Sequence, residues 1–366
     1  MNTNRRTLVK AGVAGVVASL APGARRASGR AEAGEGGMAE GKCTVELPGL
    51  VDLQVNGFAG IDFGDPALTP ERMLQAVSAV EKTGVTRFLP TLITSSLETF
   101  SACARAVVRT KHAAIVGIHM EGPYISPEDG PRGAHPRAFV RGADVDDFRR
   151  RQDAAEGRIR LVTVAPEAPG VLPLIERLVA SNVRVAIGHT GATGAQVADA
   201  VSAGATLSTH LGNGCAQMLP RHPNVIWEQL GEDRLLASFI VDGHHLPPAT
   251  VKAVIRAKTP ARTILVTDAV GAAGMPPGRY TLGGQEVELS ATGRVAAPGA
   301  PNLAGSALRL DVAVGNTVRF TGLPLEDVVP MASTRPAGYI GILAAGKVVA
   351  EWDPAACVLR IERVVP

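Results

Sequence analysis

Three side chains that commonly bind metal ions each end an apolar stretch of the sequence: Glu121, His189 and His210. Asp268 ends a fourth stretch in the same way. Two imidazoles and one carboxylate are the ligand set that holds zinc in catalytic sites and leaves one position open for water. A lone buried histidine is more often a hydrogen-bonded core residue, but four polar side chains at equivalent positions favour an active site. The pattern therefore predicts a metal centre with a further carboxylate at a strand end.

The apolar stretches that carry these residues recur along the chain and alternate with stretches of helical period. They are rich in Val, Ile and Leu without strict alternation, which is typical of parallel strands covered by helices. Eight such strands favour a closed (β/α)8 TIM-like barrel of the metallo-hydrolase type over an open doubly wound sheet, and barrel active sites lie at the carboxyl ends of the strands. No Gly-x-Gly-x-x-Gly follows the first strand, which argues against dinucleotide binding. The expected strands are 50–56, 85–91, 114–121, 160–165, 183–189, 205–210, 235–241 and 262–268, and the expected helices are 70–83, 97–111, 144–152, 171–181, 194–203, 223–231, 247–258, 306–320 and 325–333.

The two ends of the chain predict a small, truncated accessory β-layer beside the barrel. Residues 31–47 are expected to form a linker and a short accessory strand, and 48–341 the barrel. Residues 342–366 have the pattern of a β-hairpin that pairs with the accessory strand. A further hairpin is expected over 279–297, after the eighth strand.

The amino terminus resembles a twin-arginine export signal. Arg5 and Arg6 precede an apolar stretch, 11–20, that is too short for a permanent membrane span. We expect residues 1–30 to be a signal peptide that directs the protein to the periplasm or outside the cell. A disordered basic tail, or a translation start at Met38, is the alternative.

Size and charge restrict the classes of partner. The chain has 366 residues, of which 46% are hydrophobic and 19% charged, and this is sufficient for one large core. Its formal charge of +3 comes from residues 1–30, which carry six basic side chains and no acidic one. The remaining residues hold 31 basic and 34 acidic side chains, so we expect a small-molecule partner and no nucleic acid.

Nine short motifs occur together between Pro48 and Gly341. They are Pro48-Gly-Leu-Val-Asp-Leu-Gln-Val-Asn-Gly, His119-Met-Glu-Gly-Pro, Gly133-Ala-His-Pro, Val164-Ala-Pro-Glu, Gly188-His-Thr-Gly-Ala-Thr, Thr209-His-Leu-Gly-Asn, Asp242-Gly-His-His, Thr267-Asp-Ala and Leu303-Ala-Gly-Ser-Ala. In this combination the chain resembles the N-acetylglucosamine-6-phosphate deacetylases of the amidohydrolase superfamily. The family normally has a longer accessory β-sandwich than this sequence allows.

The resemblance implies one divalent metal ion per subunit, of which Zn²⁺ is expected, held by Glu121, His189 and His210. It implies that Asp268 shuttles a proton from water at the metal to the departing amine, and that His135 polarises the carbonyl oxygen. An alternative for His135 is a loop histidine in a Pro-rich turn. Gln54 and Asn56 stand where binuclear relatives carry a His-x-His pair, which predicts that a second metal is absent. Simple polar packing at the barrel mouth explains these two amides equally well.

The resemblance also implies the substrate contacts. Asn213 and Gly214 would lie near a phosphate, to which Arg221 would reach from the neighbouring subunit of a homodimer. His245 would contact the sugar phosphate. Backbone groups of Ala134, Leu303, Ala304 and Gly305 would line the sugar.

The expected reaction is hydrolysis of N-acetylglucosamine 6-phosphate to glucosamine 6-phosphate and acetate. Export conflicts with this substrate, since the family substrate is made inside the cell. One alternative is therefore an exported amidohydrolase for another N-acyl sugar or N-acyl amino acid, whose anionic group would be a carboxylate. Another is a non-catalytic barrel that binds amino sugars, although binding alone needs no proton shuttle.

Overall fold

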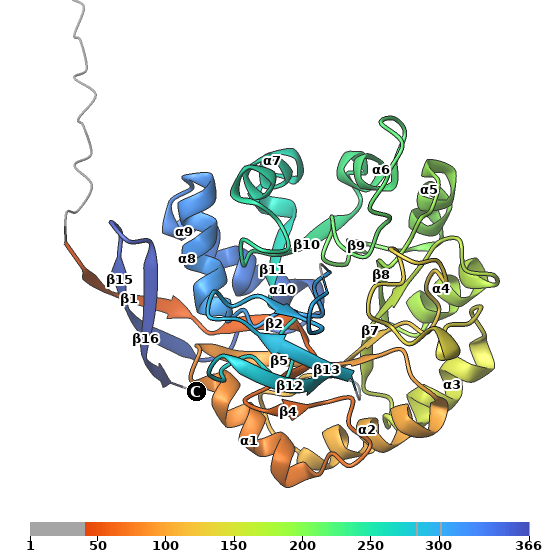
Figure 1. Ribbon diagram of the computed structural model, residues 1–366, viewed down its shortest axis with the longest axis horizontal. Helices are drawn as coiled ribbons and strands as arrows, with labels where there is room; N and C mark the ends of the chain where they lie inside the picture. Colours follow the sequence, from red (N-terminus) through yellow and green to blue (C-terminus); the bar gives the residue numbers. More distant parts are fainter. Residues whose placement is uncertain (1–40, 283–284, 301, 366) are drawn as a thin grey trace, which may run out of the picture. The chain divides into compact units, whose positions relative to one another are not determined.

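The centre of the protein is a sheet of eight parallel strands that closes on itself (Figure 1). The structure, a computed structural model, describes residues 41–282, 285–300 and 302–365. The last strand returns to the first, because Val55 bridges Ala269 and the Asp268 amide donates to the Gln54 carbonyl at 3.0 Å. In order, the strands are β2 (Leu50–Val55), β5 (Val85–Ile93), β6 (Ile118–Glu121), β7 (Ile159–Val164), β8 (Arg184–Ile187), β9 (Leu207–Ser208), β10 (Leu236–Ile240) and β11 (Thr263–Val266). The predicted (β/α)8 barrel is confirmed.

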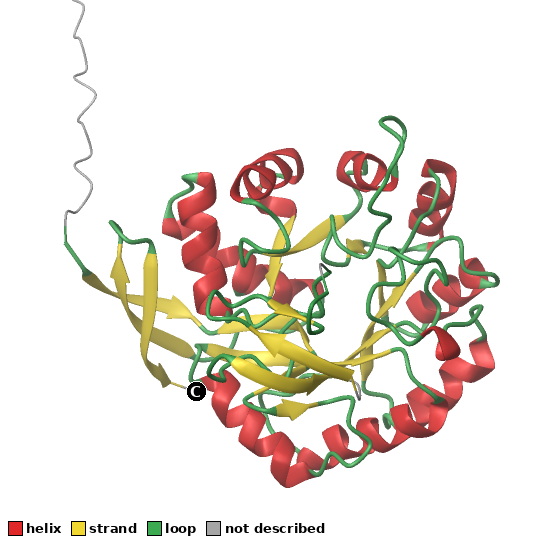
Figure 2. Cartoon of the chain, viewed as in Figure 1, coloured by secondary structure: helices red, strands yellow, loops and turns green. Residues whose placement is uncertain are grey.

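Helices surround this barrel (Figure 2), and side chains define where several of them begin. Thr69, Ser96, Asp144, Thr193 and Asn224 each accept a hydrogen bond from a backbone N–H of the following first turn. Such caps satisfy N–H groups that have no partner within the helix. The helices are α1 (Pro70–Glu81), α2 (Leu97–Thr110), α3 (Val145–Ala154), α4 (Val171–Ala180), α5 (Gly194–Ala203), α6 (Val225–Gly231), α7 (Pro248–Lys258), α8 (Leu310–Thr321), α9 (Leu325–Val328) and α10 (Thr334–Tyr339), with 3-10 turns at Arg137–Phe139, Pro260–Arg262 and Val329–Ala332.

Several predicted elements are shorter than expected, and in three of them the cause is clear. The strand predicted over 114–121 begins only at Ile118, because Ala114 lies in a turn and Ile115 forms only an isolated bridge with Phe88. The strand over 205–210 is reduced to Leu207–Ser208, since the backbone then turns away at the barrel mouth. The helix over 325–333 continues as a 3-10 turn at Pro330, which has no N–H for the helical ladder.

The chain ends form a separate antiparallel sheet, which confirms the accessory β-layer. It consists of β1 (Cys43–Pro48), β15 (Lys347–Asp353) and β16 (Val358–Val365), with β15 in the middle. Val348, Ala350, Trp352 and Leu359 are buried and join the barrel core. The accessory layer therefore shares one continuous core with the barrel.

A second small sheet lies across the barrel (Figure 1), as predicted for residues 279–297. It contains β12 (Gly278–Leu282), β13 (Gln285–Leu289) and β14 (Val295–Ala296). Val287, Leu289 and Val295 pack on Val270 in a cluster of their own. This sheet therefore rests on the segment directly after Asp268. Two short strands, β3 (Gly57–Phe58) and β4 (Ile61–Asp62), form the loop after β2.

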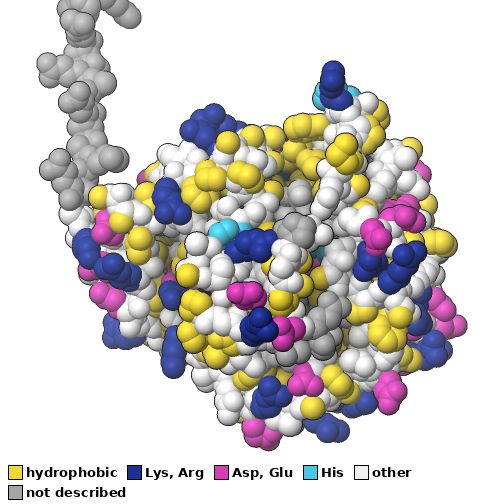
Figure 3. All heavy atoms as spheres, viewed as in Figure 1, with side chains coloured by type: hydrophobic (Ala, Val, Ile, Leu, Met, Phe, Trp, Pro, Cys, Tyr) yellow, Lys and Arg dark blue, Asp and Glu magenta, His cyan; other side chains and the backbone are white. Residues whose placement is uncertain are grey.

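The predicted signal peptide, residues 1–30, lies outside the described residues. Within the described ranges no helix has both the length and the hydropathy needed to cross a bilayer. On the face shown in Figure 3, basic and acidic side chains are interspersed.

Candidate metal centre and active site

Four predicted residues sit at the carboxyl ends of barrel strands. Glu121 is the last residue of β6, whereas His189, His210 and Asp268 each follow their strand by two positions. These three have φ of +51°, +29° and +51°, in the left-handed region. This conformation costs an L-residue roughly 1–2 kcal/mol. Its repetition indicates that the fold holds these side chains in place against their local backbone preference.

Glu121, His189 and His210 converge on one point. Oε1 of Glu121 lies 3.1 Å from Nε2 of His189 and 3.0 Å from Nε2 of His210, and the two Nε2 atoms are 3.1 Å apart. Tetrahedral zinc with bonds of about 2.0–2.1 Å separates its ligand atoms by about 3.3 Å. All three side chains are buried, and among the described residues they form the one His/Cys/Asp/Glu group of metal-binding geometry. The ligand atoms therefore fit a small divalent ion.

The surroundings of two of these side chains suit a metal ligand. Burial alone would raise the pKa of Glu121, but the adjacent imidazoles of His189 and His210 hold it well below its usual range. The carboxylate is therefore ionised, as a metal ligand must be. Nδ1 of His189 lies 2.9 Å from the Pro131 carbonyl, so this nitrogen donates and Nε2 faces the metal position. Nδ1 of His210 is buried without a partner among the described residues.

Asp268 lies beside this triad and is held by two amides. Nε2 of Gln54 donates to Asp268 Oδ1 and to Glu121 Oε1, at 3.0 Å each. Nδ2 of Asn56 donates to the same Oδ1 at 2.6 Å. Burial, and then the negative charge of Glu121, raises the pKa of Asp268 to about 6. A carboxyl group with such a pKa can both accept and donate a proton near neutral pH.

A second buried carboxyl group, that of Asp52, lies next to Thr267 and Gln54. Its Oδ2 accepts a hydrogen bond from the Thr267 hydroxyl at 2.6 Å, and its Oδ1 accepts from the backbone N–H of Gln54 at 3.1 Å. Burial raises the pKa of Asp52 to about 7. Through these contacts Asp52 joins Thr267, the residue before Asp268, to Gln54 of β2.

His135 lies on the other side of Glu121. Its Nε2 is 3.8 Å from Glu121 Oε2, and its Nδ1 is 2.8 Å from the Thr94 hydroxyl. Burial, and then the neighbouring His189, holds the pKa of His135 well below its usual range, so the ring is neutral. If the Thr94 hydroxyl donates to Nδ1 at 2.8 Å, and not to the more distant Glu121 carbonyl at 3.5 Å, Nε2 carries the proton and faces the metal position. The geometry therefore favours a functional role over a loop position alone.

Several predicted substrate residues surround the centre. Gly214 has φ +57°, and a Cβ there would lie 2.9 Å from Nδ1 of His189, so only glycine fits. Asn213 donates to the His210 carbonyl at 3.2 Å. His245 is held by Asp242, whose Oδ2 lies 2.7 Å from His245 Nδ1. These residues come from the loops after β9 and β10.

The remaining predicted residues lie at the edges. The Ser306 amide donates to the Asp268 carbonyl at 3.2 Å, which brings the preceding segment, Leu303–Ala304–Gly305, to the site. Ala134 is exposed next to His135. Arg221 is exposed in the loop between β9 and α6, and among the described residues it makes no hydrogen bond or ion pair with the metal triad. The fold thus brings all of the predicted positions except Arg221 to one mouth of the barrel.

Two contacts were not foreseen from the sequence. Thr94 follows β5 and positions His135, and Gln54 joins Glu121 to Asp268. Thr94 ends an apolar stretch as the metal ligands do, and this signal was available in the sequence. The two contacts of Gln54 depend on the order of strands around the barrel, in which β11 lies on one side of the β2–β5 pair and β6 on the other. The sequence pattern does not reveal this order.

A model of the amidohydrolase family matches residues 45–350. The chain belongs to the amidohydrolase family. It is 35% identical over 300 residues to the N-acetylgalactosamine-6-phosphate deacetylase of Escherichia coli O157:H7, covering 81% of this chain and 78% of that protein. It is 37% identical over 321 residues to the human N-acetylglucosamine-6-phosphate deacetylase, covering 81% of this chain and 75% of that one.

Solved structures of amidohydrolases agree with this family membership. A mutant N-acetyl-D-glucosamine-6-phosphate deacetylase of Mycobacterium smegmatis, in complex with N-acetyl-D-glucosamine 6-phosphate, superposes with a TM-score of 0.80 at 33% identity. The match covers 87% of this chain and 86% of that one. The similarity therefore extends over most of both chains.

Proposed function

We propose that this amidohydrolase removes the acetyl group from N-acetylglucosamine 6-phosphate and releases glucosamine 6-phosphate and acetate. One observation carries the proposal. The metal-ligand atoms of Glu121, His189 and His210 converge beside Asp268, a buried carboxyl group whose pKa is raised. A binding protein needs no such acid. The named activities of the relatives support the substrate class, since they differ only in the hexosamine.

The side chains of the site have separate tasks. A divalent ion, for which we propose Zn²⁺, would polarise the amide carbonyl and lower the pKa of an adjacent water molecule. Asp268 accepts a proton from the attacking water and donates it to the amine nitrogen as the C–N bond breaks. Neutral His135 donates from Nε2 to the carbonyl oxygen, on which negative charge develops. Gln54 and Asn56 keep the Asp268 carboxyl group oriented.

The substrate is held on the side of β9 and β10. Asn213 and the backbone at Gly214 offer groups for a phosphate, and His245, already hydrogen-bonded to Asp242, presents its other ring nitrogen. Backbone groups of Ala134 and of Leu303–Gly305 line the sugar.

Arg221 acts on this phosphate from a second subunit. It lies on the loop that projects beyond α6 (Figure 1). Met218 and Trp227, at the two ends of the same segment, are 90% and 54% exposed. Large exposed apolar side chains are typical of protein contacts. These features support a homodimer in which each Arg221 completes the partner's site.

Acetate release from N-acetylglucosamine 6-phosphate tests the proposal. The zinc-loaded protein should release acetate, and the Asp268→Asn variant should lose at least about a thousandfold in turnover while keeping its metal. Asp199→Asn, on the exposed face of α5, is the matched control and should keep both. The N-acetylgalactosamine 6-phosphate and the unphosphorylated sugar are run in parallel. Equal rates with and without phosphate would contradict the roles of Arg221 and His245.

A further inference from the structure

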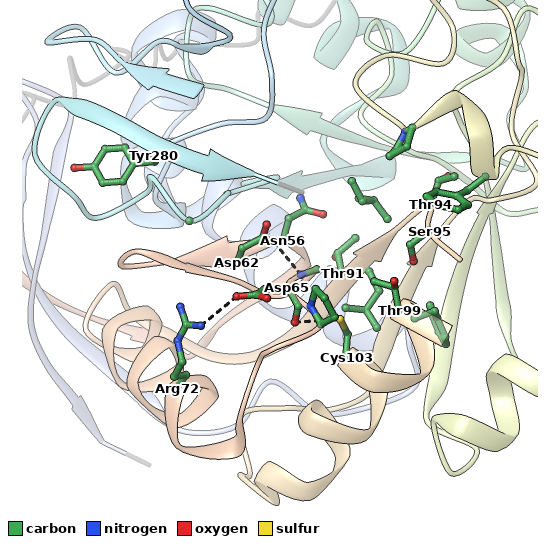
Figure 4. A pocket seen from close by; sticks show the side chains of 18 of the residues that line it. Asn56, Asp62, Asp65, Arg72, Thr91, Thr94, Ser95, Thr99, Cys103 and Tyr280 are labelled. Carbon is green, nitrogen blue, oxygen red and sulfur yellow. Dashed lines mark hydrogen bonds and ion pairs between the residues drawn. The ribbon is translucent and has the colours of Figure 1, made fainter. Parts of the chain in front are cut away.

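A cavity of about 580 Å³ lies beside the proposed reaction centre (Figure 4). It lies between the ends of β2 and β5 and the first half of α2, and Tyr280 of the β12 hairpin contributes to its outer part. Two of its lining residues also hold the reaction centre: Asn56 donates to Asp268, and Thr94 contacts His135. Oδ1 of Asn56 is buried and has no partner among the residues described. This acceptor suits the N–H of a bound acylamide.

The position of the cavity in the barrel indicates which part of a substrate it meets. The proposed sugar phosphate contacts follow β9 and β10, the sixth and seventh strands around the barrel, whereas the cavity follows β2 and β5, the first and second. In a closed ring of eight strands, the second and sixth face each other. A hexosamine held on the β9 side, with its amide at the metal, therefore directs its acyl group toward the cavity.

Part of the cavity wall is apolar. It is formed by Leu92, Ile93, Phe100, Pro136 and Phe139. An acetyl group fills little of this space, since a methyl group is about the size of a water molecule, whose volume share is about 30 Å³. The cavity is therefore far larger than an acetyl group needs during deacetylation.

The polar groups around the outer part of the cavity are already paired with one another. Arg72 Nη1 lies 3.2 Å from Asp65 Oδ2, and Asp62 Oδ1 accepts from the Gly64 amide at 2.8 Å. The Cys103 thiol donates to the Asp65 carbonyl at 3.4 Å. Among the described residues that line the cavity, Arg72 is the only basic one, and Asp65 already pairs with it. The lining therefore offers no free cation to an anionic ligand, and its apolar side suits a hydrocarbon chain.

We propose that this cavity is an acyl-chain subsite, through which the protein hydrolyses N-acyl hexosamine 6-phosphates with acyl groups of about four to six carbons. The inference rests on the proposed function. The reaction is the same hydrolysis: the C–N bond breaks, water oxygen joins the acyl carbon, and the amine leaves with the proton from Asp268. The products are the amino sugar phosphate and a short-chain carboxylate.

The first test compares kcat/KM for the N-acetyl, N-propionyl, N-butyryl and N-hexanoyl derivatives of glucosamine 6-phosphate. We expect the N-butyryl value of the wild-type protein to be within about tenfold of the N-acetyl value. A protein that releases acetate but loses more than about a thousandfold on the N-butyryl derivative contradicts the subsite alone. A protein that releases no acetate contradicts the proposed function.

A variant that fills the cavity provides the second test. Thr99 lines the cavity on α2, whereas the adjacent Glu98 points to solvent. Thr99→Phe should lower kcat/KM for the N-butyryl derivative at least about tenfold more than for the N-acetyl derivative. Glu98→Phe adds the same ring outside the cavity and should leave the ratio unchanged. An equal effect of Thr99→Phe on both derivatives overturns the proposal.

A binding measurement keeps the test independent of turnover. Zinc-loaded wild-type protein should bind hexanoate at least about tenfold more tightly than acetate by calorimetry, since the longer chain buries more apolar surface. Equal affinities for the two carboxylates overturn the subsite, whatever the fate of the Thr99 variant.

Discussion

The side-chain amide of Gln54 donates to Oδ1 of Asp268 at 3.0 Å while it also contacts the metal-site carboxylate of Glu121. One amide thus orients the proposed proton shuttle relative to the metal site. Gln54→Ala should lower kcat about 10- to 100-fold, because a hydrogen bond to a charged group is worth about 1.5–3 kcal/mol. Bound zinc, measured by elemental analysis, should remain near one per chain. A variant with wild-type kcat would show that the amide serves packing alone.

We expect Thr94 to affect the rate of the reaction through its hydrogen bond with His135. Thr94→Val keeps the shape of the side chain but removes the hydroxyl that lies 2.8 Å from Nδ1. We expect kcat to fall about tenfold with little change in KM, since the ring loses the partner that sets its tautomer. Thr94→Ser restores the hydroxyl and should recover most of the rate. If both variants behave alike, the hydroxyl has no such role.

Removal of one ligand should release the metal. In the Glu121→Gln variant, we expect less than about one tenth of the wild-type zinc content after dialysis, because the neutral amide is a poor zinc ligand. Zinc addition should then no longer raise the thermal midpoint. Glu128→Gln, on the exposed part of the loop after β6, is the matched control. Retention of zinc in the Glu121 variant would contradict the assigned triad.

Asp52 predicts a pH dependence of stability in the metal-free protein. Its folded pKa is raised from 3.8 to about 7 by burial, so the folded state binds the proton more tightly than the unfolded state. The stability that the protonated Asp52 gives the folded state is therefore lost as pH rises from about 4 to about 7. Asp52→Asn lacks this titration. Urea unfolding should show the variant gaining about 2–3 kcal/mol relative to wild type between pH 5 and pH 8. A constant difference would mean that the carboxyl group titrates normally.

Subunit complementation tests whether Arg221 acts on a neighbouring site. Arg221→Ala and Asp268→Asn should each be nearly inactive alone. In a mixed dimer, the site that keeps Asp268 receives Arg221 from the other subunit and is complete. After equal mixing and exchange of subunits, about a quarter of the wild-type activity should return. Without any recovery, Arg221 acts within its own chain or not at all.

Much of the barrel could be predicted because each strand and helix carries its own local pattern. The stretches ending at Glu121, His189, His210 and Asp268 were recognisable because parallel buried strands are uniformly apolar, so a polar residue at the end is conspicuous. Boundaries were less predictable. β9 is only Leu207–Ser208, since the chain turns early to place His210.

The sequence by itself determined the types of chemistry available: a carboxylate and two imidazoles for a metal, and a further acid for proton transfer. Tertiary structure decided the contacts between them, because those contacts join strands that are distant in sequence. The side-chain amide of Gln54, from β2, donates to Glu121 at the end of β6 and to Asp268 after β11, and burial raises the pKa of Asp268. The acyl-side cavity is likewise a product of packing, since its walls come from the ends of β2 and β5, from α2 and from the β12 hairpin. Such a space depends on how these elements approach one another, and no local pattern of residues encodes it.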